Sequence, residues 1–345
     1  MRMEDIAKIA GVSKAAVSFA LSGKQGISAE TRERILQIAK EHGYSPKSKS
    51  AAPEQALKTL LFLAFANSGI VLEQYYQQPF FRELIQYIEE RCRSYGYSLM
   101  FSSVEPEHYV EEIKTIVEEK RSDGVILLGT NLSQTQIAAI ANELTAPLVV
   151  LDTCYETLPV HFIEINNVMG AYQAGAHLAE LGHRNIGYIA SNVKIHNFED
   201  RKRGFLAALR DHQLEVAEDG FFAVAPTILS SQEELKSQLS AYLASGKPMP
   251  TAFFCECDYI AISAIKTLGE LNYRIPEDVS VVGFDNISEA RIVSPELSTV
   301  HVEKERMAQL AVDLMIQSIE SPQPVKTKVK VDTQFIPRGS SSRTE

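Results

Sequence analysis

Apolar residues recur at helical spacing from the very start of the chain. Ile6, Ala7, Ile9 and Ala10 form one stripe, which predicts a short amphipathic helix. Gly11 follows, and glycine accepts the left-handed backbone of a tight turn. We therefore expect the first helix to end at this residue.

Two more helices are predicted close behind the first. Ser13 is a good N-cap for the second helix, and Ser28 is a good N-cap for a third helix that ends at Gly43. The core face of the second helix is formed by Ala16, Val17 and Ala20. Its other face carries Lys14, Ala15, Ser18 and Phe19. Helix, tight turn and helix is an arrangement that inserts its second helix into the DNA major groove, although small three-helix units also serve protein contacts.

The pattern changes after a polar, proline-bracketed linker over residues 45–53. Continuous apolar runs, typical of buried parallel strands, then alternate with amphipathic stretches. The first series predicts strands at 60–65, 97–101, 124–128 and 148–151, separated by helices at 81–95, 109–119 and 133–144. The second series predicts helices at 171–181, 201–212 and 259–271, with strands at 186–189, 252–255 and 279–284. Two βαβ series indicate two α/β lobes with parallel sheets.

Ligands of such sheets bind beyond the carboxyl ends of the strands. Polar residues that directly follow predicted strands are therefore candidates for a ligand site. They are Asn67, Asp152, Ser191, Asn192, Cys257, Asp258 and Asp285.

The distribution of charge separates the beginning of the chain from the rest. Residues 1–50 carry nine Lys and Arg and five Asp and Glu, a net charge of +4, whereas the chain of 345 residues carries −10. A basic head on an acidic body favours phosphate binding by the head alone. No apolar run approaches the roughly 20 residues that span a membrane, and no signal peptide precedes the first helix, so we expect a cytoplasmic protein.

The sequence offers no constellation for catalysis or for a metal. It contains no G-x-S-x-G, H-E-x-x-H, Walker A or G-x-G-x-x-G motif. Four cysteines are expected to be reduced and structural, because Cys255 and Cys257 lack two further zinc ligands at matching spacing. His183 follows a helix end, where a capping or surface role is expected rather than catalysis. We therefore predict no catalytic residue, metal or cofactor.

A series of short motifs, in the same order along nearly the full length of the chain, matches the motifs of one known protein family. They are D-I-A-x-x-A-G-V-S-x-x-x-V-S (5–18), I-S-x-x-T-R (27–32), G-Y-x-P (43–46), H-L-x-x-L-G-H-R (177–184), R-x-x-G-F (201–205), I-P-E-D-V-S-V-V-G-F-D-N (275–286), S-P-x-L-S-T-V (294–300) and R-G-S (338–340). The chain resembles the lactose-repressor/galactose-repressor (LacI/GalR) family of bacterial transcription regulators.

The resemblance implies a helix-turn-helix head at 1–46, a hinge at 47–58 and an effector-binding, dimerising core at 59–345. The core is similar to periplasmic sugar-binding proteins, with an N-lobe of about 59–165 and 295–325 and a C-lobe of about 166–294 and 326–345. The family's arrangement implies a homodimer that reads a pseudo-palindromic operator. Because residues 341–345 are too short for the helix that makes tetramers, we expect dimers. Effector and operator would be coupled through the core.

The resemblance also assigns DNA-contacting positions. Lys14 and Ala15 fall on the first base-reading positions. Phe19 stands where the family usually has arginine, so a guanine contact is replaced by one that suits a thymine methyl. Positions for phosphate contact or capping are Ser13, Ser18, Ser22, Ser28, Thr31 and Tyr44. In the hinge, Pro53 replaces a leucine that wedges into the minor groove, while Lys47 and Lys49 can hold phosphates from an extended linker.

In the core, the resemblance places Arg201 as the effector-clamping arginine, with Asp152 and Asp285 as acceptors for ligand hydroxyls. An inter-lobe salt-bridge set is the alternative for these charges. The Cys257–Asp258 pair replaces an Asn-Asp pair, which removes an amide contact to a sugar. Phe80 and Phe81 either stack on a sugar or flat ring or pack in the core.

The sequence therefore predicts a regulator, most simply a repressor, that responds to a small sugar or sugar derivative. A solute-binding component of a transport system fits the core but not the head. An enzyme on the same scaffold would need a nucleophile and base that the chain does not offer.

Overall fold

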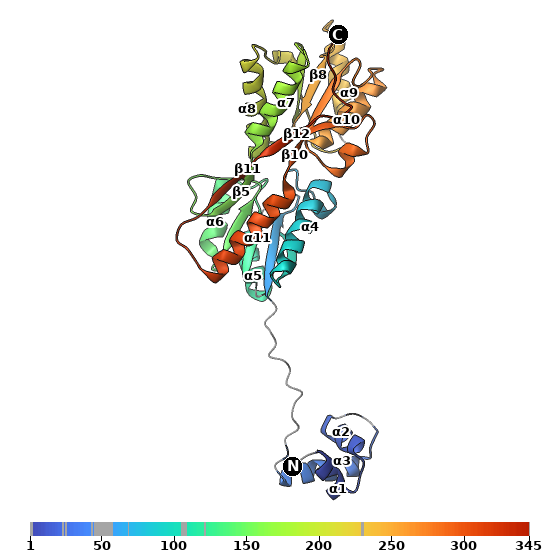
Figure 1. Ribbon diagram of the computed structural model, residues 1–345, viewed down its shortest axis with the longest axis vertical. Coiled ribbons are helices and arrows are strands. Elements are labelled where there is room, and N and C mark those ends of the chain that lie inside the picture. The colour runs from blue at the N-terminus through green and yellow to red at the C-terminus, as the bar shows by residue number, and fades with distance from the viewer. Residues whose placement is uncertain are drawn as a thin grey trace. The chain divides into compact units, whose positions relative to one another are not determined.

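The computed structural model describes residues 3–22, 24, 26–42, 44, 58–67, 69–104, 109–120, 122–228 and 231–344. The chain divides into two units, residues 1–57 and 58–345, drawn in Figure 1. The predicted hinge residues Lys47, Lys49 and Pro53 lie outside the described residues. Within the described ranges, no helix is long and apolar enough to cross a membrane.

The first unit is a three-helix head. Its helices are α1 (Met3–Ala10), α2 (Lys14–Ser22) and α3 (Ala29–Glu41). Gly11 adopts the left-handed conformation with φ 64°, and Ser13 Oγ accepts the Ala16 amide at 3.2 Å, so α1 ends and α2 begins as predicted. Ser28 caps α3 by accepting the Thr31 amide at 3.2 Å. The buried core is Ile6, Ala7, Ala10, Val17, Ala20, Ile35 and Ala39.

The second unit contains two six-stranded sheets in separate lobes (Figure 1). The first sheet has the order β11-β5-β4-β3-β1-β2, and all its pairs are parallel. Its strands are β1 (Thr59–Phe65), β2 (Ser98–Val104), β3 (Gly124–Leu128), β4 (Leu148–Leu151), β5 (His161–Ile165) and β11 (Lys328–Val331). Its helices are α4 (Pro79–Ser94), α5 (Tyr109–Lys120), α6 (Gln134–Glu143) and α11 (Lys304–Glu320).

Alternating side chains of the first sheet face two different helix layers. Leu60 and Phe62 pack with α4 and α11, whereas Leu61 and Leu63 pack with α5 and α6. Strand β1 is buried along its whole length, since both of its faces are covered. This two-sided burial is why its sequence reads as an unbroken apolar run.

The second sheet has the order β12-β10-β9-β8-β6-β7, parallel except for the antiparallel pair of β12 and β10. Its strands are β6 (Ile186–Ser191), β7 (Phe221–Val224), β8 (Ala252–Cys255), β9 (Ser280–Asp285), β10 (Ser298–Val302) and β12 (Thr333–Ile336). Helices α7 (Asn167–Glu180) and α8 (His196–Asp211) pack on one face, and α9 (Ser231–Ala244) and α10 (Asp258–Glu270) on the other. Short 3₁₀ turns are η1 (Tyr75–Gln77), η2 (Glu218–Gly220) and η3 (Ser288–Arg291).

The chain crosses between the lobes at three points, and two of them differ from the predicted lobe boundaries. Residues 295–325 were expected in the N-lobe, but β10 pairs with β9 in the second sheet, with Val300 opposite Phe284. Residues 326–345 were expected in the C-lobe, but β11 pairs with β5 in the first sheet. The local sequence of such a short strand does not tell which of the two sheets it will join, and only its pairing partner shows it.

Close packing of α7 and α8 depends on Gly204. A Cβ at this position would collide with the backbone carbonyl of Val168. We expect Gly204→Ala to lower the free energy of unfolding by about 3 kcal/mol, because a helix backbone must move to make room. Denaturant unfolding followed by circular dichroism measures the change.

Gly269→Ala is the matched control for this prediction, since a Cβ there meets nothing within 4 Å in α10. Alanine in a helix is expected to raise stability by up to about 1 kcal/mol. Equal effects of the two substitutions would contradict the packing argument.

Candidate effector pocket and DNA-reading head

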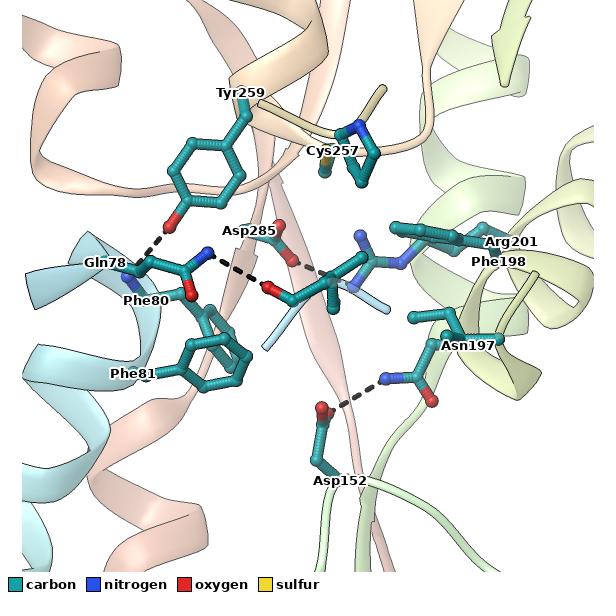
Figure 2. Close-up of a pocket in the computed structure, with 13 residues that line it drawn as sticks. Gln78, Phe80, Phe81, Asp152, Asn197, Phe198, Arg201, Cys257, Tyr259 and Asp285 are labelled. Carbon is teal, nitrogen blue, oxygen red and sulfur yellow. Dashed lines mark hydrogen bonds and ion pairs between the residues drawn. The ribbon is translucent and has the colours of Figure 1, made fainter. Parts of the chain in front are cut away.

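A cavity lies between the lobes of the second unit, at the carboxyl ends of the strands (Figure 2). The space between its walls, with the open solvent at its mouth included, is about 430 Å³. Its apolar lining is Ile70, Phe80, Phe81, Ile195, Phe198, Pro226 and Tyr259. Its polar lining is Gln78, Asp152, Asn197, Arg201, Cys257 and Asp285. Both lobes contribute, so a ligand here would touch both.

Arg201 is held on every side of its guanidinium group. Nε donates to Asn167 Oδ1 at 2.9 Å, Nη1 to the Glu256 carbonyl at 2.6 Å and Nη2 to Asp285 Oδ1 at 2.8 Å. The guanidinium carbon lies 3.7 Å from the centre of the Phe284 ring. Arg201 is 3% exposed and Asp285 6%, so the pair is screened little by solvent. The pair therefore forms a rigid polar wall of the cavity.

Asp152 occupies the opposite side of the cavity and connects the lobes. It follows β4 with φ 67°, and its Oδ1 accepts Asn197 Nδ2 from α8 at 3.0 Å. Oδ2 accepts the Thr130 hydroxyl at 2.5 Å. Burial raises the pKa of Asp152 to about 6, and it raises the pKa of Asp285 against the lowering effect of Arg201. A ligand hydroxyl that displaces Asn197 would meet an acceptor already in place.

A second link between the lobes lies at the aromatic side of the cavity. The Phe80 amide donates to the Tyr259 hydroxyl at 3.3 Å (Figure 2). Phe80 and Phe81 are in the first turn of α4, with ring centres 5.4 Å apart in a T-shaped arrangement. Gln78 precedes them, and its side chain donates to the Ile70 carbonyl at 3.1 Å. Each lobe thus supplies two aromatic rings of the cavity wall, and the second lobe supplies most of the charge.

Most, but not all, of the predicted ligand residues line the cavity. Phe80, Phe81, Asp152, Arg201, Cys257 and Asp285 line the cavity. Asp258 does not: it is fully buried, and its carboxylate accepts the Thr299 hydroxyl at 2.5 Å and the Ile287 amide at 2.9 Å. Asp258 therefore joins β10 to the turn after β9, because the first turn of α10 aims its side chain away from the cavity.

Other strand-end candidates also lie outside the lining, namely Asn67, Ser191 and Asn192. The proposed inter-lobe salt bridge is absent among these residues, since Arg201 and Asp285 both belong to the second lobe and Asp152 is linked to it through the neutral Asn197. Sequence reasoning missed Asn197, although it precedes Arg201 by four residues and so shares its face of α8.

Two groups near the site have structural roles that the sequence did not reveal. Glu256 is 4% exposed and accepts from the Tyr188 hydroxyl at 2.7 Å and the Ser191 amide at 2.6 Å. His183 is buried rather than superficial, with Nδ1 3.0 Å from Thr251 Oγ1 and Nε2 3.0 Å from the Ser342 carbonyl. It ties the C-terminal segment to the second sheet.

The described part of the chain gives no sign of a metal site. No group of three or more His, Cys, Asp or Glu with suitable geometry occurs within the described ranges. The four cysteines are buried free thiols. Burial raises the pKa of the Cys154 thiol to about 11 and that of Cys92 to about 12, so these thiols stay protonated and unreactive.

In the head, α2 exposes the side chains that the sequence assigned to DNA. Lys14, Ala15, Ser18 and Phe19 are exposed, while Val17 and Ala20 face the core. Lys14 Nζ lies 2.6 Å from Glu4 Oε1, an exposed pair that is weak enough to exchange for a phosphate or base. The Phe19 ring lies beside Gly26.

The remaining predicted DNA contacts lie around α2 or outside the described residues. Ser13 and Ser28 cap α2 and α3, and the Thr31 hydroxyl lies 2.8 Å from Ser28 Oγ. Ser22 is the last residue of α2. Tyr44 is half-buried against the head core. Contact of these residues with DNA stays a prediction.

A helix-turn-helix head on the same chain as a polar and aromatic cavity between two α/β lobes defines a DNA-binding regulator with a sensor core. Comparison with known proteins agrees. A family described as "Bacterial regulatory proteins, lacI family" matches residues 2–47, and "Periplasmic binding protein-like domain" matches residues 176–341. An HTH-type transcriptional repressor PurR of Pasteurella multocida is 30% identical over 98% of both chains. One of Mannheimia succiniciproducens is 27% identical, also over 98% of both.

The chain belongs to the lacI family of bacterial regulatory proteins, as its motifs predicted. It is a ligand-responsive, DNA-binding transcriptional repressor, and nothing in these matches supports a transport component or an enzyme. Solved structures agree on the fold. The CelR–cellobiose complex superposes with a TM-score of 0.72 and the lac repressor dimer bound to operator with 0.70, at 24% and 23% identity over 99% of each chain.

The buried carboxyl of Glu256 makes the free energy of unfolding depend on pH, and a substitution can separate its effect from that of other groups. Burial raises its pKa from 4.5 to about 7, so the folded state binds more protons than the unfolded chain in this window. Stability from this group is therefore lost as the pH rises from 4.5 to 7. We expect Glu256→Gln, which has no proton to lose, to gain about 3 kcal/mol relative to wild type between pH 4 and pH 8.

Urea unfolding at several pH values measures this difference. Glu199→Gln, an exposed carboxylate at the start of α8, is the control for the loss of one surface charge. A difference between Glu256→Gln and wild type that does not change with pH would show that Glu256 is already ionised at pH 5.

Proposed function

We propose that this repressor binds its operator as a homodimer and that a small hydroxyl-bearing molecule, in the first place a sugar or sugar derivative, enters the cavity and changes its operator affinity. The arrangement of Arg201 and Asp285 opposite Asp152 carries the proposal. Carboxylates accept from hydroxyls and arginine donates, and such charge-assisted hydrogen bonds are strong in a dry site. We further propose that it acts in the cytoplasm of a bacterium, where its DNA target would lie.

Two relatives of known structure support a sugar. CelR was solved with cellobiose, and a LacI family regulator from Enterococcus faecium, 24% identical with a TM-score of 0.68, was solved with bound ribose. A flat aromatic ring is the second candidate, because Phe80, Phe81, Phe198 and Tyr259 all line the cavity. Cys257 offers neither the donor nor the acceptor of an amide, which favours a ligand with an apolar edge there.

We propose that α2 lies in the major groove. Lys14 and Ala15 would reach base edges, and Phe19 would touch a thymine methyl where an arginine would bind guanine. Lys47 and Lys49 would hold phosphates, and so would the residues that cap α2 and α3. A homodimer would present two such helices to the halves of a pseudo-palindromic operator.

Support for the dimer comes from an exposed apolar surface on the first lobe. Phe101 lies on β2, the edge strand of its sheet, and is 58% exposed. Tyr76 is 42% exposed and its ring centre lies 6.3 Å from that of Phe101, and Leu72 is 44% exposed. Adjacent exposed apolar side chains at a sheet edge favour burial against a second copy.

Binding of the full-length protein to labelled DNA from its own upstream region tests the proposed function. Fluorescence anisotropy in 0.15 M salt should give a Kd of about 10⁻⁸ M or tighter, at least a thousandfold below random DNA. A panel of mono- and disaccharides and nucleobases is then added. At least one compound should change the operator Kd tenfold or more. Arg201→Met should weaken the response to it at least about 30-fold, since it removes one partner of a buried charge pair.

Arg210→Met, an exposed arginine on the same helix, is the control and should respond like wild type. A protein that binds operator but ignores the whole panel would refute a sugar or nucleobase effector. Binding no tighter than to random DNA would refute operator recognition by the free protein.

Phe101→Asp should separate the dimer into monomers of 38.3 kDa, because a charge would replace the most exposed ring of the apolar surface. Light scattering measures the mass, and anisotropy should show operator binding weakened at least 100-fold, since one head then contributes alone. Val325→Asp, at a side chain 77% exposed elsewhere on the chain, should remain dimeric. Dimers of the Phe101→Asp variant would place the interface on another surface.

A further inference from the structure

Lys304 is a buried cation that does not line the cavity. It is the first residue of α11 and follows the end of β10 after one intervening residue, Glu303, where the chain crosses from the second sheet to the first lobe. Only 4% of the residue is exposed. Removing an ammonium from water is costly unless acceptors surround it, so its partners define what it does.

Those partners come from both lobes. Lys304 Nζ donates to the Asp285 carbonyl at 3.1 Å and lies 3.5 Å from the Asn286 carbonyl, at the end of β9. On the other side it lies 3.2 Å from Glu83 Oε2 of α4, whose side chain is one quarter exposed. One ammonium thus joins the strand end beside the cavity to a helix of the opposite lobe.

The turn that Lys304 holds is conformationally special. Asp285 has φ 113°, which L residues rarely adopt, and Asn286 has φ 50°, a left-handed value that asparagine accepts more readily than most residues. The Asp285 carboxylate is fixed by Arg201 in the cavity, while its carbonyl is fixed by Lys304 behind it. Asn286 is anchored by Arg338 Nη2 at 2.7 Å. Asp285 therefore connects the cavity directly to Lys304, because its carboxylate lies in the cavity and its carbonyl contacts the ammonium.

Phe80 provides a second contact with the cavity. Lys304 Nζ lies 5.5 Å from the centre of the Phe80 ring, which lines the cavity. Phe80 and Glu83 are three residues apart on α4 and so lie on the same side of the helix. The ammonium is therefore in contact with the cavity wall, the strand end and α4 at once.

We propose that Lys304 is an inter-lobe latch, a positioning residue that makes the beginning of α4 respond to displacement of Asp285. The latch rests on the proposed function, because the ligand of that function is what would displace Asp285 in the wild-type protein. It acts through two discrete partners, the Asp285–Asn286 turn and Glu83, whose relative position both lobes determine.

Hydrogen–deuterium exchange of the full-length protein tests the latch without any ligand. Asp285→Asn serves as the disturbance at the cavity, and exchange is followed in peptides of α4 that cover residues 79–86. In the wild-type background, Asp285→Asn should raise exchange there about tenfold. In the Lys304→Met background, the same substitution should change it less than twofold, and Lys304→Arg, which keeps a cation, should restore the response.

An equal response of α4 to Asp285→Asn with and without Lys304 would overturn the proposal, as would no response in the wild-type background. If Lys304→Met does not fold, Glu83→Gln replaces it with the same expectation, since it removes the other end of the latch. Arg91→Met breaks the ion pair of α4 with Asp313 of α11 away from the cavity and should leave the response intact. A panel without an active compound would refute the proposed function, whereas the exchange data alone decide on the latch.

Discussion

The desolvated guanidinium of Arg201 constrains the whole sensor core. A charge at this depth persists only if its donors find acceptors, and they find them on three different elements: Asn167 at the start of α7, the Glu256 carbonyl after β8 and Asp285 at the end of β9. The Phe284 ring closes the remaining face. The second lobe is thus assembled around one cation, and the cavity inherits its polarity and rigidity from this requirement.

The two sides of the cavity also differ in how their polar groups are satisfied, because the buried Arg201 guanidinium fixes one side only. Arg201 and Asp285 are bound within one lobe and need no ligand to be satisfied, whereas Asp152 and the Phe80 amide each have a hydrogen-bond partner in the opposite lobe, Asn197 and the Tyr259 hydroxyl. Opening the lobes would therefore leave the ion pair intact and expose single hydrogen bonds to water. Breaking such a hydrogen bond costs about 1 kcal/mol, so a ligand of modest affinity can compete with it.

Local signals made much of this architecture predictable. The head follows from Gly11 and the N-cap residues Ser13 and Ser28, whose effects lie within a few residues of the chain, and the buried strands follow from unbroken apolar runs. Asp152 after β4 and Asp285 at the end of β9 were placed correctly at the cavity because strand ends converge, and Arg201 was placed there by the family resemblance. Asp258 was misplaced, because sequence order does not tell which side of a helix start faces the ligand. Strand β12 was assigned to the correct lobe, whereas β10 and β11 were assigned to the wrong ones, since neither strand carries a local sign of which sheet it pairs with. Lys304 gave no signal of its own.

The three crossings between the lobes also order the synthesis of the protein. The edge of the first sheet is completed by β11, residues Lys328–Val331, which pairs with β5 more than 160 residues earlier in the chain. On the ribosome, β5 therefore keeps an unpaired edge while the whole second lobe is being made, and unpaired edges invite misassociation between nascent chains. The lobes cannot be completed one after the other: the last strands to emerge close both sheets together. A translation product truncated before residue 328 would thus lack the closing strand of both lobes, so neither sheet can be complete until the final residues appear.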